Sequence, residues 1–237
     1  MPDRREDTPH KLLEVIVQSV AEAREAARGG ADRLEVVRQL EAGGLTPALT
    51  VVREIAAAVS VPLRVMVRNN DGYSTHAGER AALTDAAARF ADLGVDGIVI
   101  GFARGGQPEI DRVLEVLPGA NATKVTFHRA FDQLADPLAA ITTLGAVPQV
   151  DRILTSGGAG SAAARRERLA RYQHQAGERL TIIAGGGVDE EMLMLLAQTK
   201  VVREVHVGRA AREGHSVAGA VSAALVRGLR ERLDFVG

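Results

Sequence analysis

The chain has 237 residues, a formal net charge of −1 and no cysteine. Its length allows one large hydrophobic core, and its balanced charge creates no overall field that would attract nucleic acid or an acidic membrane. The absence of cysteine excludes disulfides, zinc–thiolate sites, iron–sulfur clusters and a thiol nucleophile. We therefore expect no nucleic acid or membrane partner, and any selectivity for anions must be local.

The first seven residues are mostly charged and precede no apolar run long enough for a signal peptide or a membrane span. No change in composition divides the rest of the chain into two parts. We expect a flexible tail over residues 1–10 and one domain over residues 11–237, in a protein located in the cytoplasm.

Short β-branched runs alternate with Ala-rich amphipathic segments along the whole domain, which is typical of βα units and a parallel sheet. Eight strands in a chain of this length predict a single-domain (β/α)8 TIM barrel. An open doubly wound sheet is the alternative, which the strand count disfavours. The eight predicted strands are residues 12–17, 33–37, 63–68, 97–101, 124–128, 152–155, 180–184 and 204–207.

Local patterns mark some of the expected helices. Ser19 and Glu22 have the spacing of a capping box, and Pro47 stands where a first helical turn would begin. Thr46 directly precedes this proline, so we expect it to cap the helix. An apolar-periodic helix over residues 218–233 is expected to close the outer ring.

Two loops are placed to cover the mouth of such a barrel. The glycines of segment 41–47 (EAGGLTP) would let it fold over the mouth, and segment 69–76 (NNDGYSTH) has the composition of a mobile polar loop. Tyr73 and His76 of the second loop are candidates for a lid.

Polar residues interrupt several of the apolar strands. Because strand side chains alternate between the interior and the helix layer, residues of one parity converge on the barrel axis. Ligands of such barrels bind at the C-terminal ends of the strands, where Arg68 and His128 fall. The residues expected to converge are Glu14, Glu35, Arg68, His128 and His206.

A structural interpretation of these residues is the alternative. Glu14 and Glu35 could be interior ion-pair partners of Arg64 and Arg68, since buried carboxylates must be paired or protonated. For the two histidines the alternative is a packed imidazole with its hydrogen bonds satisfied.

The segment 125–132 (VTFHRAFD) has the pattern of a buried strand with a charged tip. Burial explains Val125 and Phe127. His128 titrates near neutrality and Arg129 stays charged, so both need partners or a ligand.

Glycines gather at the ends of the last three predicted strands, in segments 155–158 (TSGG), 184–188 (AGGGV) and 208–209 (GR). Barrels commonly bind a phosphate with the loops after strands seven and eight, and glycines let backbone N–H groups approach an anion. Tight turns without a ligand are the alternative interpretation. The predicted substrate-binding residues are Arg68, Arg129, Ser156, Gly157, Gly186, Gly187, Gly208 and Arg209.

Taken together and in this order, six segments resemble the CutC family of copper homeostasis proteins. They are residues 13–15 (LEV), 29–35 (GGADRLE), 41–47 (EAGGLTP), 125–132 (VTFHRAFD), 152–158 (RILTSGG) and 184–188 (AGGGV). The resemblance implies a cytoplasmic TIM barrel, often a homo-oligomer, with a part in copper tolerance.

The chain departs from the family pattern at positions that matter for copper. The resemblance places cysteines, candidate copper ligands, where this chain has Ile16 and Val37, and a Pro-Arg pair where it has Asn69 and Asn70. Copper(I) prefers sulfur ligands, so a thiolate copper site is not expected.

Two main hypotheses follow. In the first, the protein is an acid–base enzyme, such as a lyase or isomerase, acting on a small anionic or phosphorylated metabolite. Glu14 or Glu35 is then the base and His128 the acid. In the second, His128 and His206 bind copper or another divalent metal without catalysis. A third possibility is a barrel that binds a metabolite as a sensor.

Overall fold

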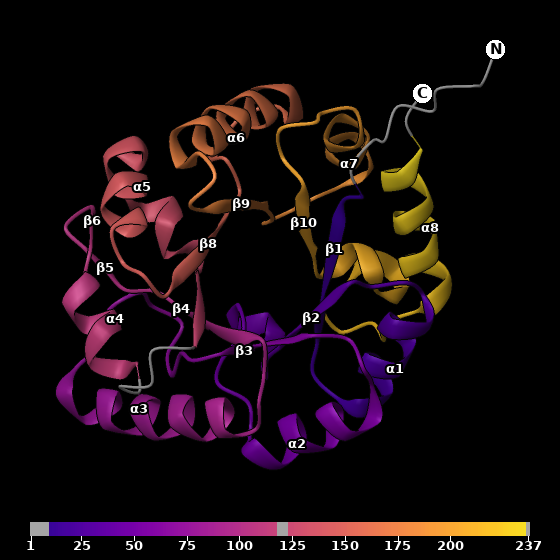
Figure 1. The fold of residues 1–237 in the computed structure, drawn as a ribbon. Helices are drawn as coiled ribbons and strands as arrows, with labels where there is room; N and C mark the ends of the chain where they lie inside the picture. The colour runs from indigo at the N-terminus through magenta and orange to yellow at the C-terminus, as the bar shows by residue number, and fades with distance from the viewer. Residues whose placement is uncertain (1–9, 118–122, 236–237) are drawn as a thin grey trace.

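The computed structural model describes residues 10–117 and 123–235. In this part of the chain, eight parallel strands close into a barrel in the order β1-β10-β9-β8-β7-β4-β3-β2 (Figure 1). Strand β1 pairs with β10 on one side and with β2 on the other, so the barrel has no free edge. The predicted TIM barrel is confirmed, and the open doubly wound sheet is wrong. The barrel strands are β1 (Leu12–Val17), β2 (Arg33–Val36), β3 (Leu63–Met66), β4 (Gly97–Ile100), β7 (Lys124–Phe127), β8 (Val150–Thr155), β9 (Thr181–Ala184) and β10 (Glu204–Val207).

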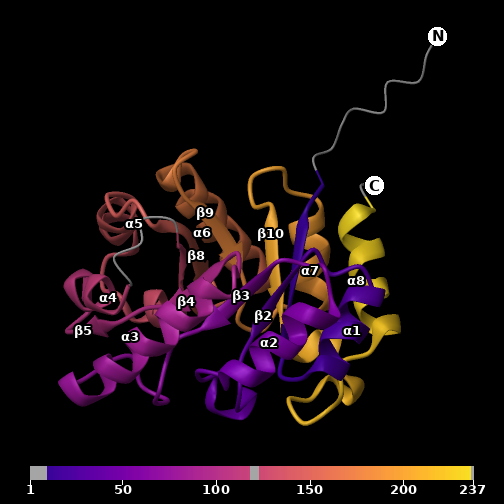
Figure 2. The same ribbon diagram turned by 60° about the horizontal axis from the view of Figure 1, so that its bottom comes forward.

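Helices surround the barrel, and the last helix lies beside the first, which completes the outer ring (Figure 2). A two-stranded hairpin, β5 (Ala103–Arg104) and β6 (Gln107–Pro108), follows β4. The helices in the described residues are α1 (Val20–Arg28), α2 (Leu49–Ala58), α3 (Ala77–Asp92), α4 (Ile110–Val116), α5 (Pro137–Gly145), α6 (Ala162–Ala176), α7 (Glu190–Ala197) and α8 (Ala223–Asp234).

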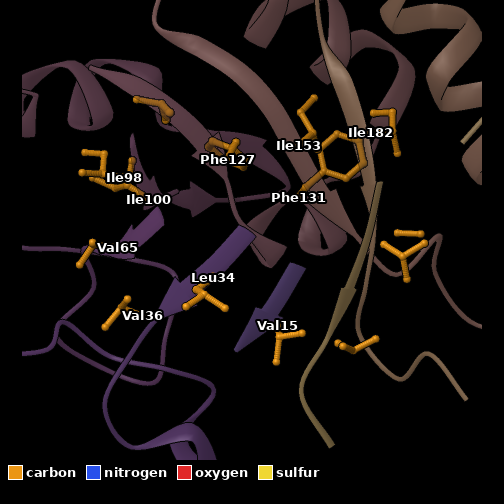
Figure 3. Packing of buried hydrophobic residues seen from close by; sticks show 14 of the residues in the cluster. Val15, Leu34, Val36, Val65, Ile98, Ile100, Phe127, Phe131, Ile153 and Ile182 are labelled. Atoms are coloured by element: carbon orange, nitrogen blue, oxygen red, sulfur yellow. The ribbon is translucent and has the colours of Figure 1, made fainter. Parts of the chain in front are cut away.

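The main hydrophobic core lies between the sheet and the helices. Strand β2 shows why: Leu34 and Val36 belong to this core, whereas the alternate residues Arg33 and Glu35 are buried polar groups. The labelled side chains in Figure 3, which include Val15, Leu34 and Val36, belong to this layer. Strand alternation therefore places most apolar side chains outward, while the barrel interior holds the polar groups and a second, smaller apolar cluster of Ile16, Val37, Met66 and Val99.

Several predicted strand ends differ by one or two residues from those observed. The third and fifth predicted strands end at Met66 and Phe127, so Arg68 and His128 lie just beyond the strands. This position at the C-terminal ends is where barrels bind ligands. Of the predicted N-terminal tail only His10 is among the described residues, and its ring hydrogen-bonds to Asp32 at 2.8 Å.

Two predicted features of the helices are wrong. Helix α2 begins at Leu49 and has no side-chain cap, because the Thr46 hydroxyl instead donates to the carbonyl of Arg68 and accepts from its N–H. The C-terminal helix begins at Ala223 rather than at residue 218. A turn precedes it, at which a side chain on Gly219 would lie 2.1 Å from the Glu213 carbonyl.

Other helix starts follow the sequence more closely. The Ser19 side chain accepts a hydrogen bond from the N–H of Glu22, although the Glu22 carboxylate accepts from Gln18 rather than closing the reciprocal box. None of the helices in the described residues is long and apolar enough to cross a membrane.

Candidate functional site

A cavity of about 730 Å³ opens at the C-terminal ends of the barrel strands. Its size lies within the usual range of small-molecule sites. The predicted site residues that line it are Glu35, Arg68, His128, Arg129, Gly186, Gly187, His206, Gly208 and Arg209. Glu14, Ser156 and Gly157 are not among its lining residues.

Glu14 is a partner in buried ion pairs. It faces His206 on β10 and Arg33 on β2 in the strand register, and its carboxylate binds the Arg33 guanidinium and, at 2.7 Å, Nδ1 of His206. Burial alone would raise the pKa of Glu14, but Arg33 and His206 lower it well below its usual value. The carboxylate therefore has little affinity for a proton, which disfavours Glu14 as the base.

An ionic network continues from Glu14 through the barrel interior. Arg33 binds Glu204 at 2.6 Å, and Arg152 binds the same carboxylate at 2.9 Å. Arg64 pairs with Asp96 and Asp151, each at 2.7 Å, rather than with a glutamate, so the expected pairing of Arg64 with Glu14 or Glu35 is wrong. The network balances buried charges of both signs.

Glu35 differs from Glu14 because one of its oxygens has no partner. Its side chain is buried, and Oε1 forms no hydrogen bond with any described residue. Oε2 lies 3.6 Å from Nε2 of His206. Burial raises the pKa of Glu35 to about 7, even though His206 opposes the rise. This carboxyl group can therefore gain and lose a proton near neutral pH.

His206 is held between two carboxylates. Its Nδ1 faces Glu14 and its Nε2 faces Glu35. Burial alone would lower the pKa of His206, but the two glutamates outweigh it and raise the pKa above its ordinary value. Gly185 leaves room for the ring, since a Cβ there would lie 3.1 Å from the imidazole. His206 therefore takes up a proton more readily than a free imidazole does, and it bridges the carboxylates of Glu14 and Glu35.

His128 has the opposite electrostatic character. The N–H of Ala130 donates to its Nδ1 at 3.1 Å, which places the ring proton of the neutral tautomer on Nε2. Burial, together with the charges of Arg68 and Arg129, lowers the pKa of His128 to about 3. Nε2 is buried and forms no hydrogen bond within the described part of the chain. At neutral pH His128 is thus a hydrogen-bond donor without a protein acceptor.

The position of the His128 ring depends on its neighbours. A Cβ on Gly101 would lie 2.8 Å from Nδ1, so only glycine leaves space for the imidazole there. The Tyr73 ring packs edge-on against His128, with 5.4 Å between the centroids. Tyr73 lines the cavity as expected for the loop after β3, whereas His76 is the N-cap of α3.

Arg68 joins the loops at the rim of the cavity. Its guanidinium donates to the carbonyls of Gly43, Asp71 and Gly72 and lies 4.9 Å from the centre of the Tyr73 ring. It forms no ion pair with Glu35 or any other described carboxylate, so the expected pairing is wrong, although Asp71 and Glu35 lie near enough to interact with its charge. Arg68 therefore adds positive potential to the cavity without needing to touch a ligand.

Two arginines from other segments lie close to the turn at Gly186 and Gly187. Both glycines have positive φ, +70° and +80°. A Cβ on Gly186 would lie 2.8 Å from Nε of Arg129, and one on Gly187 would lie 4.0 Å from the Arg209 guanidinium. Arg165 of α6, which the sequence did not single out, donates to the carbonyls of both glycines at 3.0 and 3.1 Å. The turn is thus held rigidly next to two cations.

The first glycine segment has another role. The N–H of Ser156 donates to the Asp132 carboxylate, and the N–H of Gly157 donates to the Thr155 hydroxyl, each at 3.1 Å. Both groups are already bonded, so we leave Ser156 and Gly157 out of the candidate anion site. Likewise the Asp189 side chain caps α7, so an anion is better placed near the arginines than at this helix terminus.

Comparisons with known proteins agree with the fold and the sequence pattern. The model of the CutC family matches residues 11–211. The copper homeostasis protein cutC homolog of Homo sapiens is 34% identical over 82% of this chain and 72% of its own length, and a family protein CutC of Klebsiella pneumoniae is 41% identical over 82% and 78%.

A solved structure shows the same architecture. It is described as the putative copper homeostasis protein CutC of Streptococcus agalactiae, and it superposes with a TM-score of 0.76 at 22% identity, over 84% of this chain and 98% of that one. The predicted resemblance is confirmed, because the family model covers most of the chain. The chain belongs to the CutC family.

Proposed function

We propose that the protein binds a small anionic organic molecule at the barrel mouth and acts on it by acid–base chemistry. The observation that carries this proposal is the free oxygen of Glu35, a buried carboxyl group with a pKa of about 7 on the wall of a ligand-sized cavity. A perturbed carboxyl group in a cleft is the usual form of a general base.

The charge of the molecule follows from the rim. Arg209 lines the cavity and is exposed, and its side chain forms no ion pair or hydrogen bond with the described residues. Arg129 is paired with Asp132 at 2.9 Å but keeps 46% of its side chain exposed. Together with Arg68, which lines the same cavity, these arginines favour a carboxylate or phosphate at the Gly186 turn.

Replacing Arg209 by glutamine should weaken binding of such an anion about tenfold or more, because a hydrogen bond to a charged group contributes about 1.5–3 kcal/mol. The probes are inorganic phosphate and 2-phosphoglycolate, titrated calorimetrically at low salt. Arg53→Gln, at an exposed arginine on α2 away from the cavity, is the matched control. Equal affinities in Arg209→Gln and the control would contradict the proposed anion site.

The donor atoms present argue against the copper site that the family name suggests. The chain has no cysteine, both nitrogens of His206 face carboxylates, and Nδ1 of His128 accepts an N–H bond. No cluster of three or more metal-ligating side chains is found in residues 10–117 and 123–235. The only sulfur among the cavity-lining residues is the thioether of Met66, so this donor set lacks the several soft ligands that a copper(I) site needs. We derive no step through a metal.

The family resemblance also leads us to propose a cytoplasmic protein that assembles as a homo-oligomer. Neither property is needed for acid–base chemistry at this site, because the residues that line the cavity belong to one barrel.

A further inference from the structure

Glu35 and His128 both line the cavity, and each has one buried polar atom without a hydrogen-bond partner among the described residues. Oε1 of Glu35 accepts a proton, whereas Nε2 of His128 donates a hydrogen bond. They come from different walls of the barrel, Glu35 from β2 and His128 from the end of β7. An unpartnered buried polar atom is costly, so a pair of them on one cavity indicates a ligand that satisfies both.

We propose that the ligand is a small anion with a carbonyl group and at least one hydrogen on the adjacent carbon, and that the site transfers this proton. The inference rests on the proposed function and specifies its substrate class and reaction. His128 Nε2–H donates to the carbonyl oxygen, Glu35 Oε1 faces the carbon-bound hydrogen, and the anionic group lies toward Arg129 and Arg209.

The step balances without a further reactant. The Glu35 carboxylate removes the hydrogen as a proton, and the electron pair of the broken C–H bond forms a C=C bond. The former carbonyl electron pair moves to oxygen, which becomes an enolate oxygen hydrogen-bonded to His128. The proton on Glu35 then returns to the same carbon, and the electron pair on the enolate oxygen re-forms the carbonyl.

The two imidazoles have separate roles in this arrangement. A neutral His128 gives a donor that does not protonate the enolate, and its tautomer is fixed by the Ala130 N–H. A carboxylate base opposite a neutral imidazole donor is an established pattern for proton abstraction next to a carbonyl. His206 does not contact the ligand in this assignment; it is a positioning residue that orients Glu35. The Arg68 charge stabilises the negative enolate from nearby.

The test is hydrogen exchange of three probes in D2O at pD 8, followed by proton NMR: pyruvate, 2-oxobutyrate and dihydroxyacetone phosphate. We expect the protein to exchange the hydrogens next to the carbonyl of at least one probe. Glu35→Gln should slow this exchange at least a hundredfold. His128→Ala should slow it about 100- to 1,000-fold, and His128→Gln, which keeps a donor near the Nε2 position, should stay within about tenfold of the wild type.

Exposed residues supply matched controls. Glu54→Gln on α2 and His174→Ala on α6 lie away from the cavity and should exchange at the wild-type rate. Circular dichroism spectra of all variants exclude unfolding as the cause of a loss.

Three outcomes would overturn the inference. In the first, the anions bind in an Arg209-dependent manner but no probe exchanges, which removes the carbonyl assignment and leaves the anion site. In the second, exchange is unchanged in both Glu35→Gln and His128→Ala. If the probes neither bind nor exchange, the proposed function fails together with the inference.

Discussion

Replacing Arg33 by leucine should lower the free energy of unfolding by about 3–5 kcal/mol, the usual cost of removing one partner from a buried ion pair. Arg33 is 2% exposed and neutralises the carboxylates of both Glu14 and Glu204. Without it, Glu14 keeps only His206 and Glu204 keeps only Arg152, in an interior that solvates charge poorly.

Urea unfolding followed by circular dichroism measures this loss. Arg53→Leu, at an exposed arginine, should change the free energy of unfolding by less than about 0.5 kcal/mol. Adding Glu14→Gln to Arg33→Leu should recover part of the loss, because the unpaired carboxylate is then removed. A loss below 1 kcal/mol in Arg33→Leu would show that the network does not hold the barrel interior together.

Glu35→Gln should stabilise the protein more at pH 8 than at pH 5, by about 3 kcal/mol. The folded-state pKa of Glu35 is raised from 4.5 to about 7, chiefly by burial, so its stabilising contribution is fully present below 4.5 and is lost as the pH rises through 7. One pKa unit corresponds to about 1.4 kcal/mol, which sets the size of the effect. The raised pKa of His206 likewise makes the wild-type protein less stable as the pH rises.

The measurement compares urea unfolding of the wild type, Glu35→Gln and the exposed control Glu54→Gln at both pH values. Only Glu35→Gln should change its difference from the wild type between pH 5 and pH 8. Such a gain in stability with a loss of chemistry is expected where an active site retains an unfavourable buried charge. Parallel pH profiles for wild type and Glu35→Gln would contradict this prediction.

The fold could be predicted from the sequence because strand and helix segments alternate with a regular period. The same alternation placed Glu35, His128 and His206 on the barrel interior, since residues of one parity share a face. Arg33 and Glu204 have the same parity as Glu35 and His206, so they also point into the barrel. The sequence did not single them out, because a polar residue at the first position of a strand is easily taken for its solvent-exposed start. Their pairing depends on the register of β1, β2 and β10.

Other features could not be predicted because they depend on contacts between distant segments. Thr46 stands at a position typical of a helix cap. Its hydroxyl instead bonds to the backbone of Arg68, because the loop that contains Thr46 lies beside the end of β3. Ser156 and Gly157 had the composition of an anion-binding loop, but Asp132 and Thr155 use their N–H groups. The different roles of Glu14 and Glu35 likewise follow from which glutamate lies next to Arg33.

The proposed acid–base chemistry depends most directly on the proton affinity of Glu35. A titration of its side-chain carboxyl carbon by NMR between pH 4 and pH 9, assigned by comparison with Glu35→Gln, measures this property in the intact protein. We expect a midpoint near 7. A midpoint near the ordinary value of 4.5 would show a carboxylate that is solvated or fully paired, and would contradict the assignment of Glu35 as the acid–base group of the barrel mouth.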